Sequence, residues 1–169
     1  FFTWRISKKN RFTRSNLLFP ILGGLFTAFD FAFWNYAVLY TSASNATLLG
    51  NTAPIWVALV TIFIFRKKLP LGFWLGLILT FMGAALVLSR DFLIHPRFGI
   101  GDLMALAAGF FYAGYLIATQ FGRESLDPLS YMTIMVMSAS LITFIFNIFL
   151  GFSFTGYSQQ SWLVFLLLA

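Results

Sequence analysis

A series of long apolar stretches with almost no charge constrains this chain more than any other feature. A helix needs about 20 predominantly apolar residues to cross the hydrocarbon core of a bilayer. Five such stretches lie at 17–40, 45–65, 72–89, 102–121 and 128–150, and a sixth occupies 161–169, where the chain ends. Only 9% of the 169 residues are charged, too few to cover a water-soluble fold of this size. The sequence therefore predicts an all-α, polytopic integral membrane protein, a bundle of transmembrane helices.

The basic residues are distributed unevenly over the segments between these helices. Nine of the 11 fall in three segments that would share one side of the membrane: Arg5, Lys8, Lys9, Arg11 and Arg14, then Arg66, Lys67 and Lys68, then Arg123. The opposite side receives only Arg90 and Arg97. The positive-inside rule therefore predicts that residues 1–16 and 66–71 are cytoplasmic and that 90–101 form an external loop. Topology accounts for the net charge of +6, so no nucleic-acid partner is expected.

Asp30 lies near the middle of the first predicted helix. Placing an ionised carboxylate there costs about 2.5–3.5 kcal/mol on insertion scales, so such a residue normally faces the bundle interior or a wet cavity. At 100° per residue it shares one stripe with small and polar residues: Gly23, Thr27, Trp34, Ala37 and Thr41. We interpret this stripe as the inward face. Asp30 is a candidate solute-binding and coupling residue, and a structural hydrogen bond to another helix is the alternative.

The second predicted helix carries a polar stripe beside a proline. Pro54 cannot donate to the carbonyl of Gly50, so the helix should kink or open there. Thr47, Gly50 and Asn51 lie next to this point, and a broken helix with polar groups at mid-membrane is typical of a solute site. A simple packing kink explains the same residues equally well.

The remaining helices carry weaker signals. Tyr112 and Tyr115 fall on one side of the fourth helix with Ala108 and Thr119, where they could line a pore. The fifth helix has a similar stripe: Thr133, Ser140, Thr143 and Asn147. Small and hydroxylated residues also mediate ordinary helix contacts, and we favour packing for both stripes. Three glycines give the third helix a face for close helix packing: Gly72, Gly76 and Gly83.

Enzymatic chemistry has little support in the sequence. The chain has no cysteine and a single histidine, His95, so no metal site and no cofactor are expected. Four of its five acids lie at or near helix ends. Asp102 is placed to cap the N-terminus of the fourth helix, and Asp127 precedes Pro128 at the start of the fifth. No catalytic residues are predicted.

The run from Asp30 to Pro54 resembles the EamA family of the drug/metabolite transporter superfamily. It contains Tyr40-Thr41 and Ala46-Thr47-Leu48-Leu49 before the proline, and the segment from Gly101 to Tyr115 resembles the opening of the family's second repeat. The resemblance implies a ten-helix inverted-repeat transporter of which this chain is a fragment. Residues 17–89 would then be the last three helices of the first repeat and 102–169 the start of the second.

The resemblance implies a secondary transporter that moves small organic metabolites or drugs across the cell membrane, outward, by alternating access. Its partners would be the solute, the bilayer and the remaining helices of the full-length protein, and a second copy of the protein is a further candidate. The main alternative is a structural or binding membrane subunit, or a module that scrambles lipid. A membrane-embedded enzyme ranks third.

Overall fold

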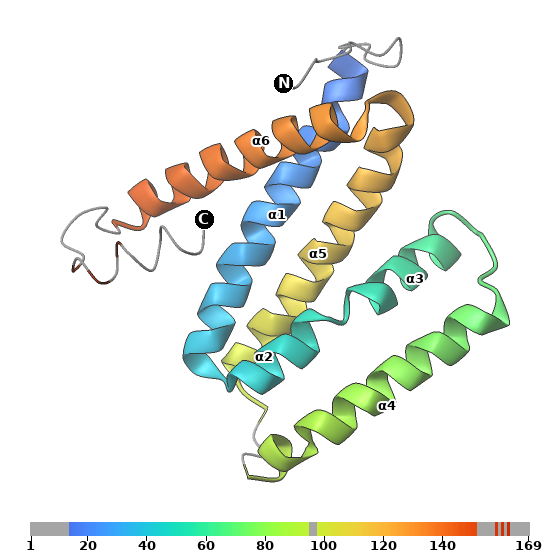
Figure 1. Cartoon of the computed structure of the whole chain (residues 1–169), viewed down its shortest axis with the longest axis vertical. Coiled ribbons are helices and arrows are strands. Elements are labelled where there is room, and N and C mark those ends of the chain that lie inside the picture. The colour runs from blue at the N-terminus through green and yellow to red at the C-terminus, as the bar shows by residue number, and fades with distance from the viewer. Residues whose placement is uncertain (1–13, 95–97, 152–157, 159, 161, 163–169) are drawn as a thin grey trace.

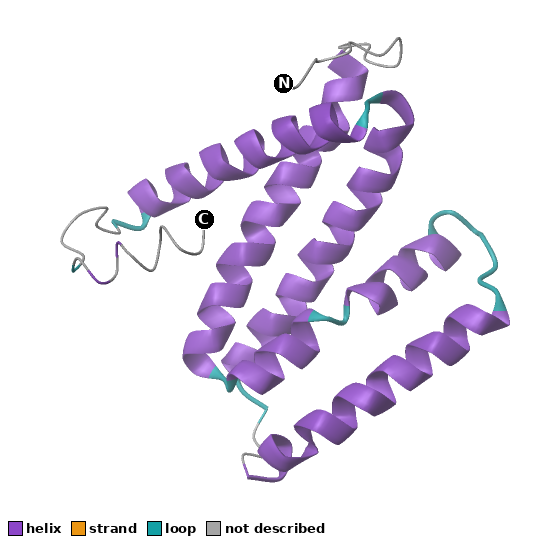
Figure 2. Ribbon diagram, in the orientation of Figure 1, coloured by secondary structure: helices purple, strands orange, loops and turns teal. Residues whose placement is uncertain are grey.

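The structure is a computed structural model, and it describes residues 14–94 and 98–151 together with residues 158, 160 and 162. Every regular element in this part of the chain is a helix (Figure 2). The helices are α1 (Arg14–Tyr40), α2 (Ala43–Gly50), α3 (Ala53–Phe63), α4 (Leu71–Ile94), α5 (Ile100–Ser125) and α6 (Pro128–Phe149). Four apolar stretches are long enough to cross a membrane: Asn16–Tyr40, Ala43–Phe63, Ile100–Ser125 and Pro128–Phe149. The predicted fold class, a polytopic bundle of membrane helices, is confirmed.

Several helix limits differ from those predicted. α1 begins at Arg14 and not at 17, and α4 continues to Ile94, into the predicted loop 90–101. The predicted helix 45–65 is two helices, α2 and α3. Hydropathy identifies only the part of a helix that lies in lipid. The backbone hydrogen bonds continue beyond that part, so hydropathy alone misplaces the helix ends. Residues 1–13 of the predicted cytoplasmic segment 1–16, His95 and most of the predicted sixth span lie outside the described residues.

The centre of the fold is the pair α1 and α5, which lie side by side and make the largest interface (Figure 1). α5 presents small residues to its neighbours at every fourth position: Gly101, Ala105, Gly109 and Ala113, all buried. This spacing places them on one face, where backbones can approach closely. α6 crosses α1 at Gly24, where an added Cβ atom would lie 2.6 Å from the Met135 carbonyl oxygen. A Cβ atom added at Gly101 of α5 would likewise lie 2.6 Å from the carbonyl carbon of Tyr40, so both helix pairs include a close backbone contact.

Polar contacts tie together the ends of these helices. The Thr41 hydroxyl donates to Asp102 Oδ1 at 2.7 Å, which joins the end of α1 to the first turn of α5. The other carboxylate oxygen of Asp102 accepts from the Gly99 N–H at 2.7 Å. Gly99 is the N-cap residue and Asp102 lies three residues later, so the prediction that Asp102 is the N-cap was wrong. Its carboxylate reaches back to the cap, an arrangement that still satisfies a terminal N–H group.

At the opposite end of α5, a buried tyrosine joins three helices. Tyr131, in the first turns of α6, is fully buried, and its hydroxyl forms a 3.1 Å hydrogen bond with Thr119 of α5. Its ring lies against Gly122 of α5, and its hydroxyl lies against Gly23 of α1. Asp127 caps the helix by accepting from the Leu129 and Ser130 N–H groups. α6 is therefore held at its start, next to α1 and α5.

α4 stands apart from the other helices (Figure 1). Its main contact is with α2. A Cβ atom added at Gly72, Gly76 or Gly83 would meet nothing within 4 Å among the described residues. The expected close approach of another helix to this face is therefore absent from the described part of the chain. The packing role of the three glycines stays a prediction.

Candidate functional site

The break between α2 and α3 is built by the residues just before Pro54. α2 ends at Gly50, Asn51 and Thr52 form a turn, and Pro54 sits in the first turn of α3, where its missing N–H group costs nothing. The Asn51 side-chain amide donates to the Thr47 carbonyl at 2.7 Å, and the Thr52 hydroxyl donates to the Leu49 carbonyl at 2.6 Å. Both carbonyls also accept a backbone N–H, from Asn51 at 3.1 Å and from Thr52 at 3.2 Å, so each side chain adds a second hydrogen bond at the end of α2.

This break is pressed against α5 at Gly109. A Cβ atom added at Gly109 would lie 2.6 Å from the Thr52 hydroxyl oxygen and 2.9 Å from the Gly50 carbonyl oxygen. Only a glycine leaves room for the backbone of the turn at this distance. Trp56 of α3 donates its indole N–H to the Thr52 hydroxyl at 3.3 Å and so holds the turn from the other side. The polar turn is therefore fixed in place at the side of α5.

Five of the seven predicted site residues gather around this turn in a pocket of about 340 Å³. Its lining residues are Asp30, Phe31, Trp34, Gly50, Asn51 and Tyr112. The Trp34 indole lies directly on the turn, because a Cβ atom at Gly50 would be 3.3 Å from Trp34 Cδ1. The pocket thus brings together side chains of α1, of α5 and of the α2–α3 turn.

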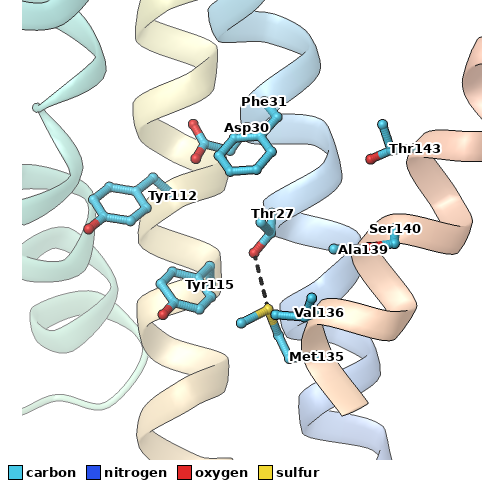
Figure 3. A pocket seen from close by; sticks show the side chains of 10 residues that line it. All are labelled: Thr27, Asp30, Phe31, Tyr112, Tyr115, Met135, Val136, Ala139, Ser140 and Thr143. Atoms are coloured by element: carbon cyan, nitrogen blue, oxygen red, sulfur yellow. Dashed lines mark hydrogen bonds between the residues drawn. The ribbon is translucent and has the colours of Figure 1, made fainter. Parts of the chain in front are cut away.

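A larger pocket of about 540 Å³ adjoins the first and shares Asp30, Phe31 and Tyr112 with it. Its other lining residues are Thr27, Tyr115, Met135, Val136, Ala139, Ser140 and Thr143. Figure 3 shows Asp30 and Thr27 of α1 between the two tyrosines of α5 and the hydroxylated residues of α6. We call the two pockets together the Asp30 cleft. Their combined volume suits a small organic molecule.

Asp30 is the only acidic residue among the described residues that line the cleft. Within the described chain no hydrogen bond or ion pair engages its carboxylate, so the alternative of a structural hydrogen bond to another helix finds no partner among these residues. Tyr112 and Tyr115 stack beside it, with ring centroids 5.8 Å apart and an interplanar angle of 15°. A carboxylate beside aromatic faces can bind a cationic group through charge and through the ring quadrupoles. It can also accept and release a proton.

Thr47 lies apart from this cleft. Its side chain is exposed, donates to the Ala43 carbonyl at 2.7 Å, and lines neither pocket. Thr47 instead contributes its own carbonyl to the cap made by Asn51. Thr47 lies one helical turn before Asn51, on the same helix, and the pocket reaches only the last turn, at Gly50 and Asn51.

Sequence reasoning missed several residues that build the cleft. Ser140 and Thr143 were interpreted as packing residues, and the structure places both in the lining of the larger pocket. Gly109 was not singled out, although the four-residue spacing of small residues from Gly101 is a recognisable signal. Nothing in the sequence marks Phe31, an exposed aromatic on a helix rich in phenylalanine.

Comparison with known protein families assigns the chain to one of them. The profile of the EamA-like transporter family matches residues 1–89, which is more than half of the chain. The chain belongs to the EamA-like transporter family. The EamA match contains Asp30, Trp34, Gly50 and Asn51, whereas the tyrosines of α5 and the residues of α6 lie beyond it. Family membership and the four apolar helical stretches together identify a multi-pass membrane protein.

A relative in Bacillus subtilis (strain 168), named as the uncharacterized transporter YxxF, is 27% identical to this EamA chain. The alignment covers 96% of the chain and 53% of the relative, so the chain spans about half the length of the relative. No solved structure matches the chain. The similarity to YxxF extends through α5 and α6 and so covers both sides of the Asp30 cleft.

Proposed function

We propose that this protein is a secondary transporter that moves small organic solutes out across the cell membrane by alternating access. In this proposal the Asp30 cleft is the solute site, and Asp30 is the coupling group. Trp34 and the stacked tyrosines form apolar walls, while Asn51 and the hydroxyls of α6 offer hydrogen bonds. One observation carries the proposal: the Asp30 carboxylate lies within a membrane helix, has no partner in the described chain, and lines a cleft beside a broken helix. In transporters such a break commonly marks the solute site.

A bulky residue in the cleft tests the proposal directly. Ser140 is exposed and lines the larger pocket, so tryptophan at this position should fill the cleft without disturbing buried packing. We expect Ser140→Trp to reduce solute flux in proteoliposomes to the rate of protein-free vesicles. Leu141, its neighbour, is 60% exposed and lines neither pocket, so Leu141→Trp should transport normally. Equal flux in the two variants would exclude the cleft as the path. Wild-type protein without flux would favour a structural or binding subunit.

The uneven distribution of basic residues supports an orientation with residues 1–16 and 66–71 in the cytoplasm. The chain has no cysteine, so a single introduced cysteine can report its own side of the membrane. We expect a membrane-impermeant thiol reagent, added to intact cells, to label Phe98→Cys and to spare Lys67→Cys. Permeabilised cells should show labelling of both. Labelling of Lys67→Cys in intact cells would reverse the proposed orientation.

A further inference from the structure

A second groove lies between α1, α3 and α5, and it shares no lining residue with the Asp30 cleft. It measures about 310 Å³ and is lined by Phe19, Leu22, Phe26, Trp56, Val60, Phe110, Ala113, Gly114, Ile117, Ala118 and Phe121. Every one of these side chains is apolar except for the Trp56 indole N–H, which already donates to Thr52. Any occupant with polar groups would lose its hydrogen bonds to water here and gain none, so the groove selects a hydrocarbon.

The length of the groove matches one leaflet of a bilayer. Along α5 it extends from Phe110 to Phe121, which at 1.5 Å per residue is roughly 17 Å. Half of a hydrocarbon core of about 30 Å is about 15 Å. One end lies at Trp56 and Phe110, beside the break that we place at mid-membrane, and their rings meet edge to face at 5.5 Å. The groove therefore extends from the middle of the membrane to one surface.

The surface end of the groove carries a cluster of positive charge. Phe121 stacks on Phe19 at 5.7 Å and contacts Phe65 at 5.4 Å, and Phe65 directly precedes the basic turn Arg66–Lys68. The Lys67 N–H donates to the Thr61 carbonyl at 3.0 Å, which fixes the turn to the end of α3. The three basic side chains are exposed, and none forms an ion pair within the described chain.

We propose that the groove and this basic turn together bind one anionic phospholipid. Its acyl chain lies in the groove, and its phosphate lies at the Arg66–Lys68 turn. The apolar walls of the groove are as long as one leaflet, which matches the acyl chain. They end at a cluster of three cations, which matches the anionic headgroup. Basic residues at a membrane surface attract anionic headgroups, and each contributes roughly fivefold in binding. The inference is independent of the transport proposal, because it uses no residue of the Asp30 cleft.

Native mass spectrometry of the purified protein, with phosphatidylglycerol and phosphatidylcholine of identical acyl chains, tests this site. We expect one phosphatidylglycerol to be retained at least about tenfold more tightly than phosphatidylcholine. The variant Arg66→Gln/Lys67→Gln/Lys68→Gln should lose this preference. Val60→Trp should fill the groove and abolish retention of either lipid. Leu59→Trp, its neighbour on α3, lines no wall of the groove and should bind as the wild type does.

The outcomes separate a lipid site from its alternatives. If the triple glutamine variant no longer binds phosphatidylglycerol but Val60→Trp binds it as the wild type does, the lipid is attracted only by the surface charge. That result would overturn the proposed site. A wild-type dimer that Val60→Trp converts to monomer would show a second copy in the groove instead. If Val60→Trp does not fold, a fluorescence measurement tests the site instead. The protein is placed in phosphatidylcholine vesicles that contain a small fraction of phosphatidylglycerol with brominated acyl chains, which quench nearby tryptophans. The brominated lipid should quench more tryptophan fluorescence in the wild type than in Trp56→Phe, because only the wild type has a tryptophan in the groove. Equal quenching in the two proteins would refute the proposal.

Discussion

Asp30→Asn should abolish solute movement driven by an ion gradient while leaving the protein folded in the membrane. Asparagine has nearly the size of aspartate and still forms hydrogen bonds, but it carries no charge and binds no proton. The expected result is gradient-driven flux at the level of protein-free vesicles. Stability should not fall, because the substitution removes a carboxylate whose insertion costs about 2.5–3.5 kcal/mol. Flux and thermal unfolding of the same preparation would measure both effects.

Asp30→Glu is the matched control, because it restores a titratable carboxylate on a longer side chain. We expect it to recover part of the gradient-driven flux. Solute exchange without a gradient then distinguishes the two roles proposed for Asp30. If exchange persists in Asp30→Asn, the residue couples transport to the ion, and if exchange is lost, the residue binds the solute itself. Unchanged gradient-driven flux would remove Asp30 from the mechanism altogether.

Gly109→Ala should lower the stability of the protein. The added methyl group would meet the Thr52 hydroxyl oxygen at 2.6 Å and the carbonyl oxygens of Gly50 and Leu49 at 2.9 and 3.0 Å. Two of these three atoms are backbone and cannot rotate away, so α5 or the turn has to move. Such overpacking costs about 1–3 kcal/mol in free energy of unfolding, in part offset by the greater helix propensity of alanine, about 1 kcal/mol.

Thermal unfolding in detergent measures this loss, and Gly109→Val should increase it. Gly99→Ala is the matched control at the start of the same helix. A Cβ atom there would meet only an Asp102 carboxylate oxygen, at 4.0 Å, so the expected cost is limited to the lower N-cap preference of alanine, about 1 kcal/mol or less. Because the turn also forms one wall of the cleft, Gly109→Ala should lower flux as well. Equal unfolding temperatures for the two alanine variants would contradict the close contact described for α5.

The sequence was most informative about elements that depend on local chemistry. Long apolar stretches identify membrane helices because each must satisfy its own backbone hydrogen bonds in lipid. Pro54 correctly indicated an interrupted helix, but the interruption precedes it, at Asn51 and Thr52. The reason is that proline clashes with the turn before it and is tolerated in the first turn of the helix that follows.

Contacts between helices were harder to predict, because spacing alone does not name the partner. Gly72 and Gly76 have the same four-residue spacing as Gly101 and Ala105, yet only the second pair meets a neighbouring helix in the described chain. The face of α1 that carries Asp30 could be recognised from helical periodicity. That α5 and α6 complete its cleft could not, since Ser140 and Thr143 are equally compatible with packing and with a solute path.

The pairing of α1 with α5 has a consequence for how the protein is made. α2, α3 and α4 lie between them in the chain, so the ribosome completes four helices before the partner of α1 is finished. Asp30 therefore enters the bilayer before Tyr112 and Tyr115 exist to shelter it. The phenylalanines and leucines on the rest of α1 favour its insertion into lipid before α5 is available. These apolar residues therefore act first in membrane insertion of α1 and only later in assembly of the bundle.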